Sequence, residues 1–187
     1  MTFGALLLTM VAGVFASNFA LEQFLGLTPF LGFSGKNAKS FTMGLCVTAV
    51  MLLTTACAWV LESFVLAPLA LGYLRVPVFA ALVLCFAYLL GWIFKKAGKD
   101  GLGRYFPLVA LNSAVLGVAV ITVTAGCGIA EALFTALGAG LGFALMMPVM
   151  QGVIGRIDVK HVPRAFQGLP VYLLAASIIS MVLVAFK

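Results

Sequence analysis

Residues 40–61 read SFTMGLCVTAVMLLTTACAWVL, and no charged side chain lies between Lys39 and Glu62. At about 1.5 Å per helical residue this stretch spans roughly 33 Å. The hydrocarbon core of a bilayer is about 30 Å thick. The stretch therefore predicts a helix that crosses a membrane.

Uncharged stretches of similar length lie on both sides of this one, in a chain that is 64% hydrophobic and 9% charged. A soluble domain carries about 25% charged residues. We therefore predict an all-α membrane protein, with the lipid bilayer as its main solvent and residues 1–187 as a single integral membrane domain. The six expected transmembrane helices are Phe3–Leu21, Ser40–Leu61, Val76–Phe94, Tyr105–Ala130, Ala132–Gly155 and Ala165–Phe186.

The net charge of +6 is concentrated in alternate connections between these helices. Nine basic residues lie in the first, third and fifth connections: Lys36, Lys39, Lys95, Lys96, Lys99, Arg104, Arg156, Lys160 and Arg164. The other two connections and both ends carry only Arg75 and Lys187. Because cytoplasmic loops collect Lys and Arg, both termini are expected outside. The same rule explains the positive charge without a nucleic-acid partner.

Two segments of the chain resemble each other. Residues 25–32 align with residues 110–117, so that Thr28 falls on Ser113 and a Leu-Gly pair repeats. The copies are three spans apart, so the halves would cross the membrane in opposite directions, as in the inverted repeats of many transporters. We predict two inverted three-helix repeats, about 1–94 and 95–187. Chance similarity in a chain rich in Leu and Gly is the alternative.

Both copies contain polar or helix-breaking residues where a plain span would be apolar. Pro29 lies in the first copy, and Pro107 and Asn112-Ser113 interrupt the fourth span. Irregular backbone at membrane depth is tolerated only where protein or a cavity covers it. We therefore expect re-entrant or broken half-helices near the pseudo-two-fold axis. The alternative is that Pro29 and Pro107 mark simple kinks.

The polar side chains on these broken segments are the site residues that the sequence predicts. They are Asn18, Glu22, Thr28, Asn112 and Ser113, and Glu22 is the only carboxylate among them. An ionisable group at membrane depth is a functional candidate. Asn18, Glu22 and Asn112 are therefore expected along an ion path, although Glu22 could equally be an interfacial residue that reaches water.

Motifs for other chemistry are weak. The four cysteines form no C-x-x-C pair and are expected to be buried free thiols. His161 has no carboxylate or cysteine beside it, which makes no metal motif. The sequence has no phosphate-binding glycine loop and no visible nucleophile–base pair, so we expect a subunit without catalytic residues of its own. The pair Gly138 and Gly142 indicates close helix packing.

Three segments carry a family resemblance. Residues 17–32 (SNFALEQFLGLTPFLG), residues 106–108 with 112–119 (FPL and NSAVLGVA) and residues 162–170 (VPRAFQGLP) resemble signatures of one membrane family. That family includes the A subunit of the Rnf electron-transport complex and the related E subunit of the sodium-pumping NADH:quinone reductase. The resemblance runs over nearly the whole chain in the right order, and we favour the Rnf branch.

The resemblance implies a function. In this family the protein pairs with a homologous membrane subunit of opposite topology, which in the Rnf complex is the E subunit, and with other Rnf-type subunits. Together the pair places a [2Fe–2S] cluster inside the bacterial or archaeal cytoplasmic membrane, with two cysteine ligands from each partner. Electron transfer across the membrane is linked to translocation of Na⁺ or H⁺.

This sequence departs from the family at the ligand positions, which are Thr28 and Ser113 here. A hydroxyl is a far poorer ligand than a thiolate for iron–sulfur chemistry. Three readings stay open: the partner holds the cluster alone or with other donors, the cluster is absent, or the chain serves as part of an ion path. Alternatives from other classes are a cofactor-free transporter half and a structural anchor for redox subunits.

Overall fold

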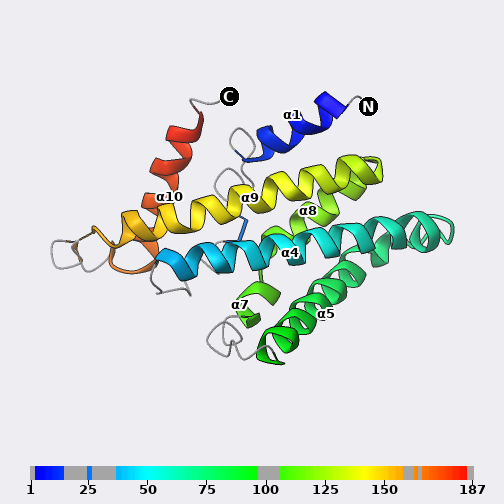
Figure 1. The fold of residues 1–187 in the computed structure, drawn as a ribbon, viewed down its shortest axis with the longest axis horizontal. Coiled ribbons are helices and arrows are strands. Elements are labelled where there is room, and N and C mark those ends of the chain that lie inside the picture. Colours follow the sequence, from blue (N-terminus) through cyan, green and yellow to red (C-terminus); the bar gives the residue numbers. More distant parts are fainter. Residues whose placement is uncertain are drawn as a thin grey trace.

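The computed structural model describes residues 3–14, 25–26, 37–96, 106–157, 162–163 and 166–184. Within these residues the regular structure is helical, which confirms the predicted all-α class (Figure 1). The α-helices are α1 (Phe3–Val14), α4 (Asn37–Leu61), α5 (Arg75–Lys96), α7 (Phe106–Ala110), α8 (Ser113–Thr124), α9 (Ile129–Ile154) and α10 (Leu169–Val184). A π-helical turn, Glu62–Leu66, extends α4, and a 3₁₀ turn, Gly72–Leu74, precedes α5.

Three of the described helical segments are long and apolar enough to cross a membrane: Ser40–Leu66, Gly72–Lys96 and Ile129–Ile154. They correspond to the second, third and fifth predicted spans. The other three predicted spans contain shorter apolar helices: Gly4–Val14, Ser113–Thr124 and Leu169–Leu183. Residues 15–21 of the first predicted span lie outside the described residues.

The fourth predicted span, Tyr105–Ala130, is interrupted at Asn112-Ser113, as the sequence predicts. It divides into α7 and α8, and residues 125–128 form a turn before α9. Pro107 does not cause the break, because it lies in the first turn of α7, where a missing N–H is tolerated. The break falls at Leu111 and Asn112. The sixth predicted span also begins too early, since α10 begins at Leu169 after Gly168, whose φ is +84°.

Helices α4 and α9 form the centre of the molecule and run antiparallel along each other (Figure 1). Small residues let their backbones approach closely. A Cβ atom on Gly44 would lie 2.5 Å from the Cα of Ala144, and one on Gly140 would lie 2.5 Å from Cγ2 of Thr48. The two helices are the second in each predicted half, and an inverted repeat requires them to be antiparallel. The complete repeat stays a prediction.

Helix α1 packs on the other side of α9 through the same kind of contact. A Cβ atom on Gly138 would collide with the backbone carbonyl oxygen of Met10. A Cβ atom on Gly13 would lie 3.3 Å from the backbone at Gly138 and Ala139. The interpretation of Gly138 as a helix-packing residue is therefore confirmed.

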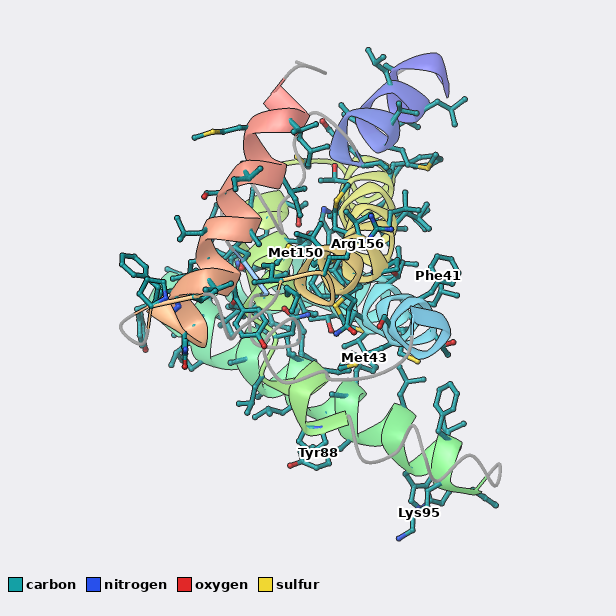
Figure 2. All side chains as sticks on the ribbon, turned by 90° about the vertical axis from the view of Figure 1, so that its left-hand side faces the viewer. Phe41, Met43, Tyr88, Lys95, Met150 and Arg156 are labelled. Carbon is teal, nitrogen blue, oxygen red and sulfur yellow. The ribbon has the colours of Figure 1, made fainter. Side chains whose placement is uncertain are left out.

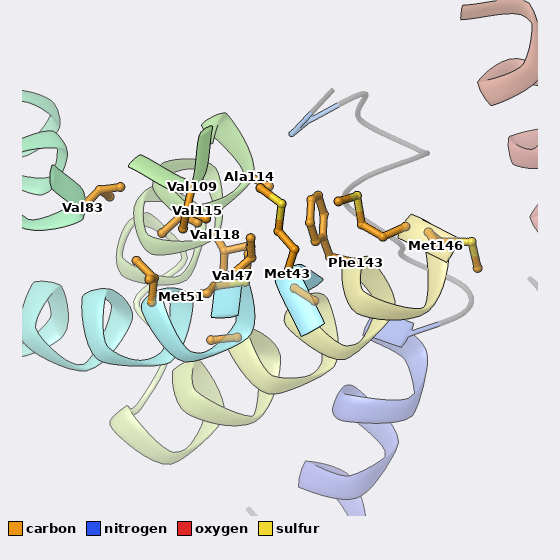
Figure 3. Close-up of a cluster of buried hydrophobic side chains, with 14 of the residues drawn as sticks. Met43, Val47, Met51, Val83, Val109, Ala114, Val115, Val118, Phe143 and Met146 are labelled. Carbon is orange, nitrogen blue, oxygen red and sulfur yellow. The ribbon is translucent and has the colours of Figure 1, made fainter. Parts of the chain in front are cut away.

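The main core lies where α4, α8 and α9 meet, with contributions from α5, α7 and α10 (Figure 3). Phe143 of α9 and Met43 of α4 are 1% exposed, and Val115 of α8 is fully buried. The remaining members are Val47, Val50, Met51, Val83, Val109, Ala114, Val118, Ala136, Ala139, Met146, Met147, Met150 and Ala176. This core holds the α7–α8 break against the central pair of helices.

Two polar contacts are found at one end of the molecule. The indole Nε1 of Trp59, near the end of α4, donates a hydrogen bond of 2.9 Å to the carbonyl oxygen of Cys127 in the α8–α9 turn. Beyond α4, Glu62 forms a two-point ion pair with Arg75, in which the Arg75 Nε to Glu62 Oε2 distance is 3.0 Å. The second and fourth connections therefore lie together, as the charge pattern predicts.

Large apolar side chains also cover much of the outer surface. On α5, Tyr88 and Lys95 point away from the other helices (Figure 2), and Tyr88 is 66% exposed. On α10, Met181 is 74% exposed. Exposed apolar surface of this extent marks contact with a membrane or with other proteins, and it suits the predicted membrane location.

Candidate functional site at the break between α7 and α8

The break between α7 and α8 is shaped by Asn112. Its backbone is extended, with φ −79° and ψ 109°, so the helix cannot continue through it. Its side chain then caps α8, because its Oδ1 accepts a hydrogen bond of 2.9 Å from the backbone N–H of Ala114. The break thus places the positive end of the α8 dipole inside the protein.

The first-half segment Leu25–Gly26 packs directly against this helix start. The backbone N–H of Gly26 donates a hydrogen bond of 2.9 Å to Oγ of Ser113. Gly26 has φ +81°, a conformation that favours glycine. A Cβ atom there would also lie 2.7 Å from Asn112 Oδ1 and 2.9 Å from Phe143 Cε2. Only glycine therefore fits between α8 and α9 at this position.

Leu25 makes the second contact of this junction. Its Cδ1 atom lies 2.8 Å from the place that a Cβ atom on Gly117 would occupy. Gly117 is one helical turn beyond Ser113 on α8. Leu25–Gly26 therefore lies alongside the first turn of α8. The contacts among Leu25, Gly26, Asn112, Ser113 and Gly117 are called the junction below.

The structure brings two of the predicted site residues to the junction. Asn112 caps α8, and Ser113 accepts the hydrogen bond from Gly26. Asn18, Glu22 and Thr28 lie outside the described residues. Their roles in an ion path and at the family ligand position therefore stay predictions.

The side chain of Asn112 is 2% exposed, and only one half of its amide is used. Its Oδ1 caps α8, whereas its Nδ2 has no hydrogen-bond partner among the described residues. The free half of the amide is a donor, which matches an acceptor better than a cation. In the structure Asn112 caps α8, and its predicted place on an ion path stays a prediction.

The donor set at Ser113 does not fit an iron–sulfur cluster. A serine hydroxyl is not a thiolate, and here Oγ accepts a hydrogen bond from Gly26. Such clusters are held by cysteine thiolates, with histidine as the known variation. The described residues contain no group of three or more His, Cys, Asp or Glu side chains that could hold a metal. Helix α8 separates Ser113 from Cys127 by roughly 17 Å of helix rise.

The cysteines are free thiols, as predicted, but they are not all buried. Cys46 on α4 is buried, Cys57 and Cys127 are partly exposed, and Cys85 on α5 is exposed. The prediction of uniformly buried thiols is therefore wrong for Cys85. The reason is that α5 presents much of its surface outward, so apolar sequence there does not imply burial within the chain.

Two residues at or beside the junction were missed by the sequence reasoning. The sequence places Gly26 only within the stretch 17–32 that resembles a family signature, whereas its φ of +81° and its contacts make it essential to the junction. The Gly-x-Thr-Pro spacing from Gly26 to Pro29 was the available signal. Phe143 carries no such signal, because α9 is apolar on all sides.

The arrangement defines a class of protein: a helical membrane protein in which a break in one helix meets a short segment of the other half inside the core. The Rnf-Nqr subunit family of membrane proteins matches residues 6–187. The chain belongs to this family.

Several named relatives are similar over almost their whole length. The A subunit of the Na⁺-translocating ferredoxin:NAD⁺ oxidoreductase complex of Acetobacterium woodii is 36% identical over 97% of this chain and 96% of the relative. The A subunit of the ion-translocating oxidoreductase complex of Syntrophotalea carbinolica is 35% identical, and that of Shigella flexneri is 34% identical. Each alignment covers 97% of this chain and 95% of the relative. The predicted resemblance to the Rnf branch is confirmed.

Proposed function

We propose that this chain is a membrane subunit of an ion-translocating oxidoreductase complex of the Rnf type. It helps to carry electrons across the membrane together with a homologous subunit of opposite topology. Family membership and the names of the full-length relatives support the complex. The structural observation that supports the role of this chain is the junction. There the backbone N–H of Gly26, in the first half, donates a hydrogen bond to Ser113 at the start of α8.

In this proposal the chain has a structural role within the complex, because its described residues offer no catalytic group. Asn112 and Ser113 hold the two halves together inside the bundle. The hydroxyl at Ser113 does not suit iron, so any [2Fe–2S] cluster of the complex is held by donors of the partner subunit, alone or with other groups. Ser113 itself then has a structural role.

A second candidate function is a cofactor-free ion-transport or anchor subunit. The residue types favour it, since both family ligand positions carry hydroxyl residues, Thr28 and Ser113. In this version Glu22 and Asn18 serve the ion path, and electrons pass through other subunits. The two candidates differ in whether electron transfer depends on this chain.

The deciding experiment uses the intact complex in sealed vesicles, with and without this chain. The first candidate predicts that loss of the chain abolishes electron transfer from reduced ferredoxin to NAD⁺ together with ion uptake. Electron transfer that continues without the chain, while ion uptake stops, would support the second. Glu22→Gln is the matched point variant, which should lower ion uptake only in the second case.

A companion measurement locates the cluster. Iron analysis and electron paramagnetic resonance of the wild-type complex should show a [2Fe–2S] signal that disappears on substitution of the partner's cysteines. Ser113→Ala in this chain should leave that signal unchanged. A signal that Ser113→Ala removes would overturn the assignment of the ligands to the partner.

We further propose that the chain resides in the cytoplasmic membrane of a bacterium or archaeon with both termini outside. The distribution of basic residues supports this orientation. Cys127, in the α8–α9 turn, then faces the exterior. A membrane-impermeant maleimide should label Cys127 in whole cells. Labelling only after the cells are opened would show the opposite topology, with this turn and both termini inside.

A further inference from the structure

The outer side of α5 carries a basic end and an apolar stripe. Lys95 and Lys96 lie in the last turn of the helix, and both are exposed. Leu84, Tyr88 and Lys95 follow one another at spacings of four and seven residues, which places them on one face of the helix. Leu84 is 42% exposed, and Tyr88 and Lys95 point away from the other helices (Figure 2). A ligand outside the helix bundle can therefore contact all three.

The stripe leads to a pocket of about 290 Å³ between α5 and the α7–α8 break. Its α5 wall is formed by Ala80, Val83 and Leu84, and Leu111 and Leu116 also line it. Six of its eight lining residues are apolar, so an apolar group is the occupant that the lining favours. Leu111 is 68% exposed, so the pocket opens through apolar residues on the outer surface. In a membrane this opening faces the hydrocarbon chains of the lipids.

The separation between the basic end and the pocket matches the dimensions of one lipid molecule. Leu84 and Lys95 are eleven residues apart on α5, which is roughly 17 Å of helix rise. Half of the hydrocarbon core of a bilayer is about 15 Å thick, and the acyl chains of one leaflet extend to that depth. A lipid whose phosphate lies beside Lys95 therefore places the end of an acyl chain at the pocket.

The basic end selects the charge of the lipid headgroup. The ammonium group of Lys96 lies 5.3 Å from the centre of the Trp92 ring, and tryptophan is enriched at membrane interfaces. A lysine near the membrane surface favours anionic lipid by about fivefold. The carbonyl end of α5 carries partial negative charge, which reduces this attraction. Lys95 and Lys96 together should therefore favour an anionic headgroup by about tenfold.

We propose that the outer face of α5 binds one anionic phospholipid. Its phosphate lies beside the ammonium groups of Lys95 and Lys96. One acyl chain follows Tyr88 and Leu84, and the end of that chain fills the pocket beside the α7–α8 break. The lipid thereby packs the space between α5 and the start of α8. The proposal rests on the membrane location of the chain and not on electron transfer, so it does not depend on the function proposed above.

Fluorescence quenching at Trp92 measures the preference for an anionic headgroup. The chain has two tryptophans, and Trp59→Phe in every protein tested leaves Trp92 as the only reporter. The full chain is placed in phosphatidylcholine bilayers that contain a fixed fraction of a brominated lipid. That lipid is either phosphatidylglycerol or phosphatidylcholine with the same brominated chains. We expect phosphatidylglycerol to bind beside Trp92 about tenfold more strongly, and equal quenching by the two lipids would overturn the proposal.

Two variants that each remove one positive charge separate this site from general attraction to a basic surface. Lys95→Gln should lower the preference for phosphatidylglycerol about threefold. Arg156→Gln removes a charge just beyond the end of α9, away from Lys95 (Figure 2), and should leave the preference unchanged. An equal loss in the two proteins would overturn the proposal.

A titration followed by native mass spectrometry measures phosphatidylglycerol binding to the full chain with both tryptophans present. Ala80→Leu fills the pocket and should weaken binding at least threefold. Ala81→Leu adds the same side chain at the next, exposed position and should leave binding within twofold. The Lys95→Gln and Arg156→Gln pair is repeated here, so that the result does not depend on Trp59→Phe. An Ala80→Leu protein that binds the lipid as well as the Ala81→Leu protein would overturn the proposal.

The intact complex provides the last arm of the test. It should bind phosphatidylglycerol with the same dependence on Lys95. Loss of this dependence in the complex would show that a partner subunit covers the outer face of α5, and it would overturn the proposal.

Discussion

The backbone N–H of Gly26 donates a hydrogen bond of 2.9 Å to Oγ of Ser113, across 87 residues of sequence. This contact joins the first half of the chain to the start of α8 in the second half. It also uses the side chain at a position where the family resemblance implies an iron ligand. The Ser113 hydroxyl stabilises the protein fold because it accepts this hydrogen bond from a backbone N–H. The hydrogen bond holds the junction together although Ser113 supplies no thiolate.

Removal of the hydroxyl by Ser113→Ala should lower the free energy of unfolding by about 1 kcal/mol, the usual net value of one hydrogen bond. Gly26→Ala should cost about 3 kcal/mol, because it adds strain at positive φ and a collision with Asn112 and Phe143. Thermal unfolding in detergent measures both. Gly4→Ala is the control, since nothing lies within 4 Å of a Cβ atom there. A Gly26→Ala protein as stable as the Gly4→Ala protein would contradict the junction.

The contact between α1 and α9 depends on Gly138. Gly138→Ala should destabilise the protein by about 1–3 kcal/mol, because the new methyl group collides with the carbonyl oxygen of Met10 and α1 must move. Gly152→Ala on the same helix has open space and should be neutral or stabilising by up to about 1 kcal/mol. The difference between the two melting temperatures is the measurement. Equal melting temperatures would show that α1 does not pack at Gly138.

The ion pair between Glu62 and Arg75 connects the end of α4 to the start of α5. Glu62→Gln or Arg75→Gln alone should lower the free energy of unfolding by about 2 kcal/mol, because each leaves a charged partner with fewer hydrogen bonds. The double variant should lose less than the sum of the single losses. Thermal unfolding of the four proteins in a double-mutant cycle measures the coupling, and purely additive losses would contradict it.

The thiol of Cys127 should react slowly at neutral pH. Burial raises the pKa of Cys127 above its ordinary value, and the negative charge of Glu131 raises it further. Since the thiolate is the reactive form, the alkylation rate should reach half of its maximum at a higher pH than for a free thiol. Glu131→Gln should shift this midpoint to lower pH. The rate is measured across neutral and alkaline pH with Cys46, Cys57 and Cys85 replaced by Ala, and an unshifted or reversed midpoint would refute the expectation.

Local sequence features predicted the long helices well. The uncharged stretches around residues 40–61, 76–94 and 132–155 have the length of a membrane span, and the structure has α4, α5 and α9 at these places. The interruption at Asn112-Ser113 was also predictable, because Asn favours a helix N-cap and competes with helical backbone hydrogen bonds.

Other features depend on tertiary contacts that the sequence does not encode locally. One example is the pocket between α5 and the α7–α8 break, which Ala80 and Val83 of α5 line together with Asn112 and Ser113. Helices that are apolar on all sides carry no pattern that tells which face points inward. For the same reason the sequence could not predict that Phe143 lies against Gly26 or that Cys85 lies on an exposed face.

The central claim is that segments from the two halves of the chain meet at the junction. Leu25→Cys and Gly117→Cys test it in a protein without other cysteines, because the Leu25 side chain lies against Gly117. Mild oxidation of the protein in membranes should link these two cysteines within one chain, as detected by mass spectrometry of the joined peptides. The control pair, Leu25→Cys with Gly128→Cys at the N-cap of α9, beyond the far end of α8, should stay unlinked. Reactive thiols at residues 25 and 117 that form no intramolecular disulfide would contradict the account.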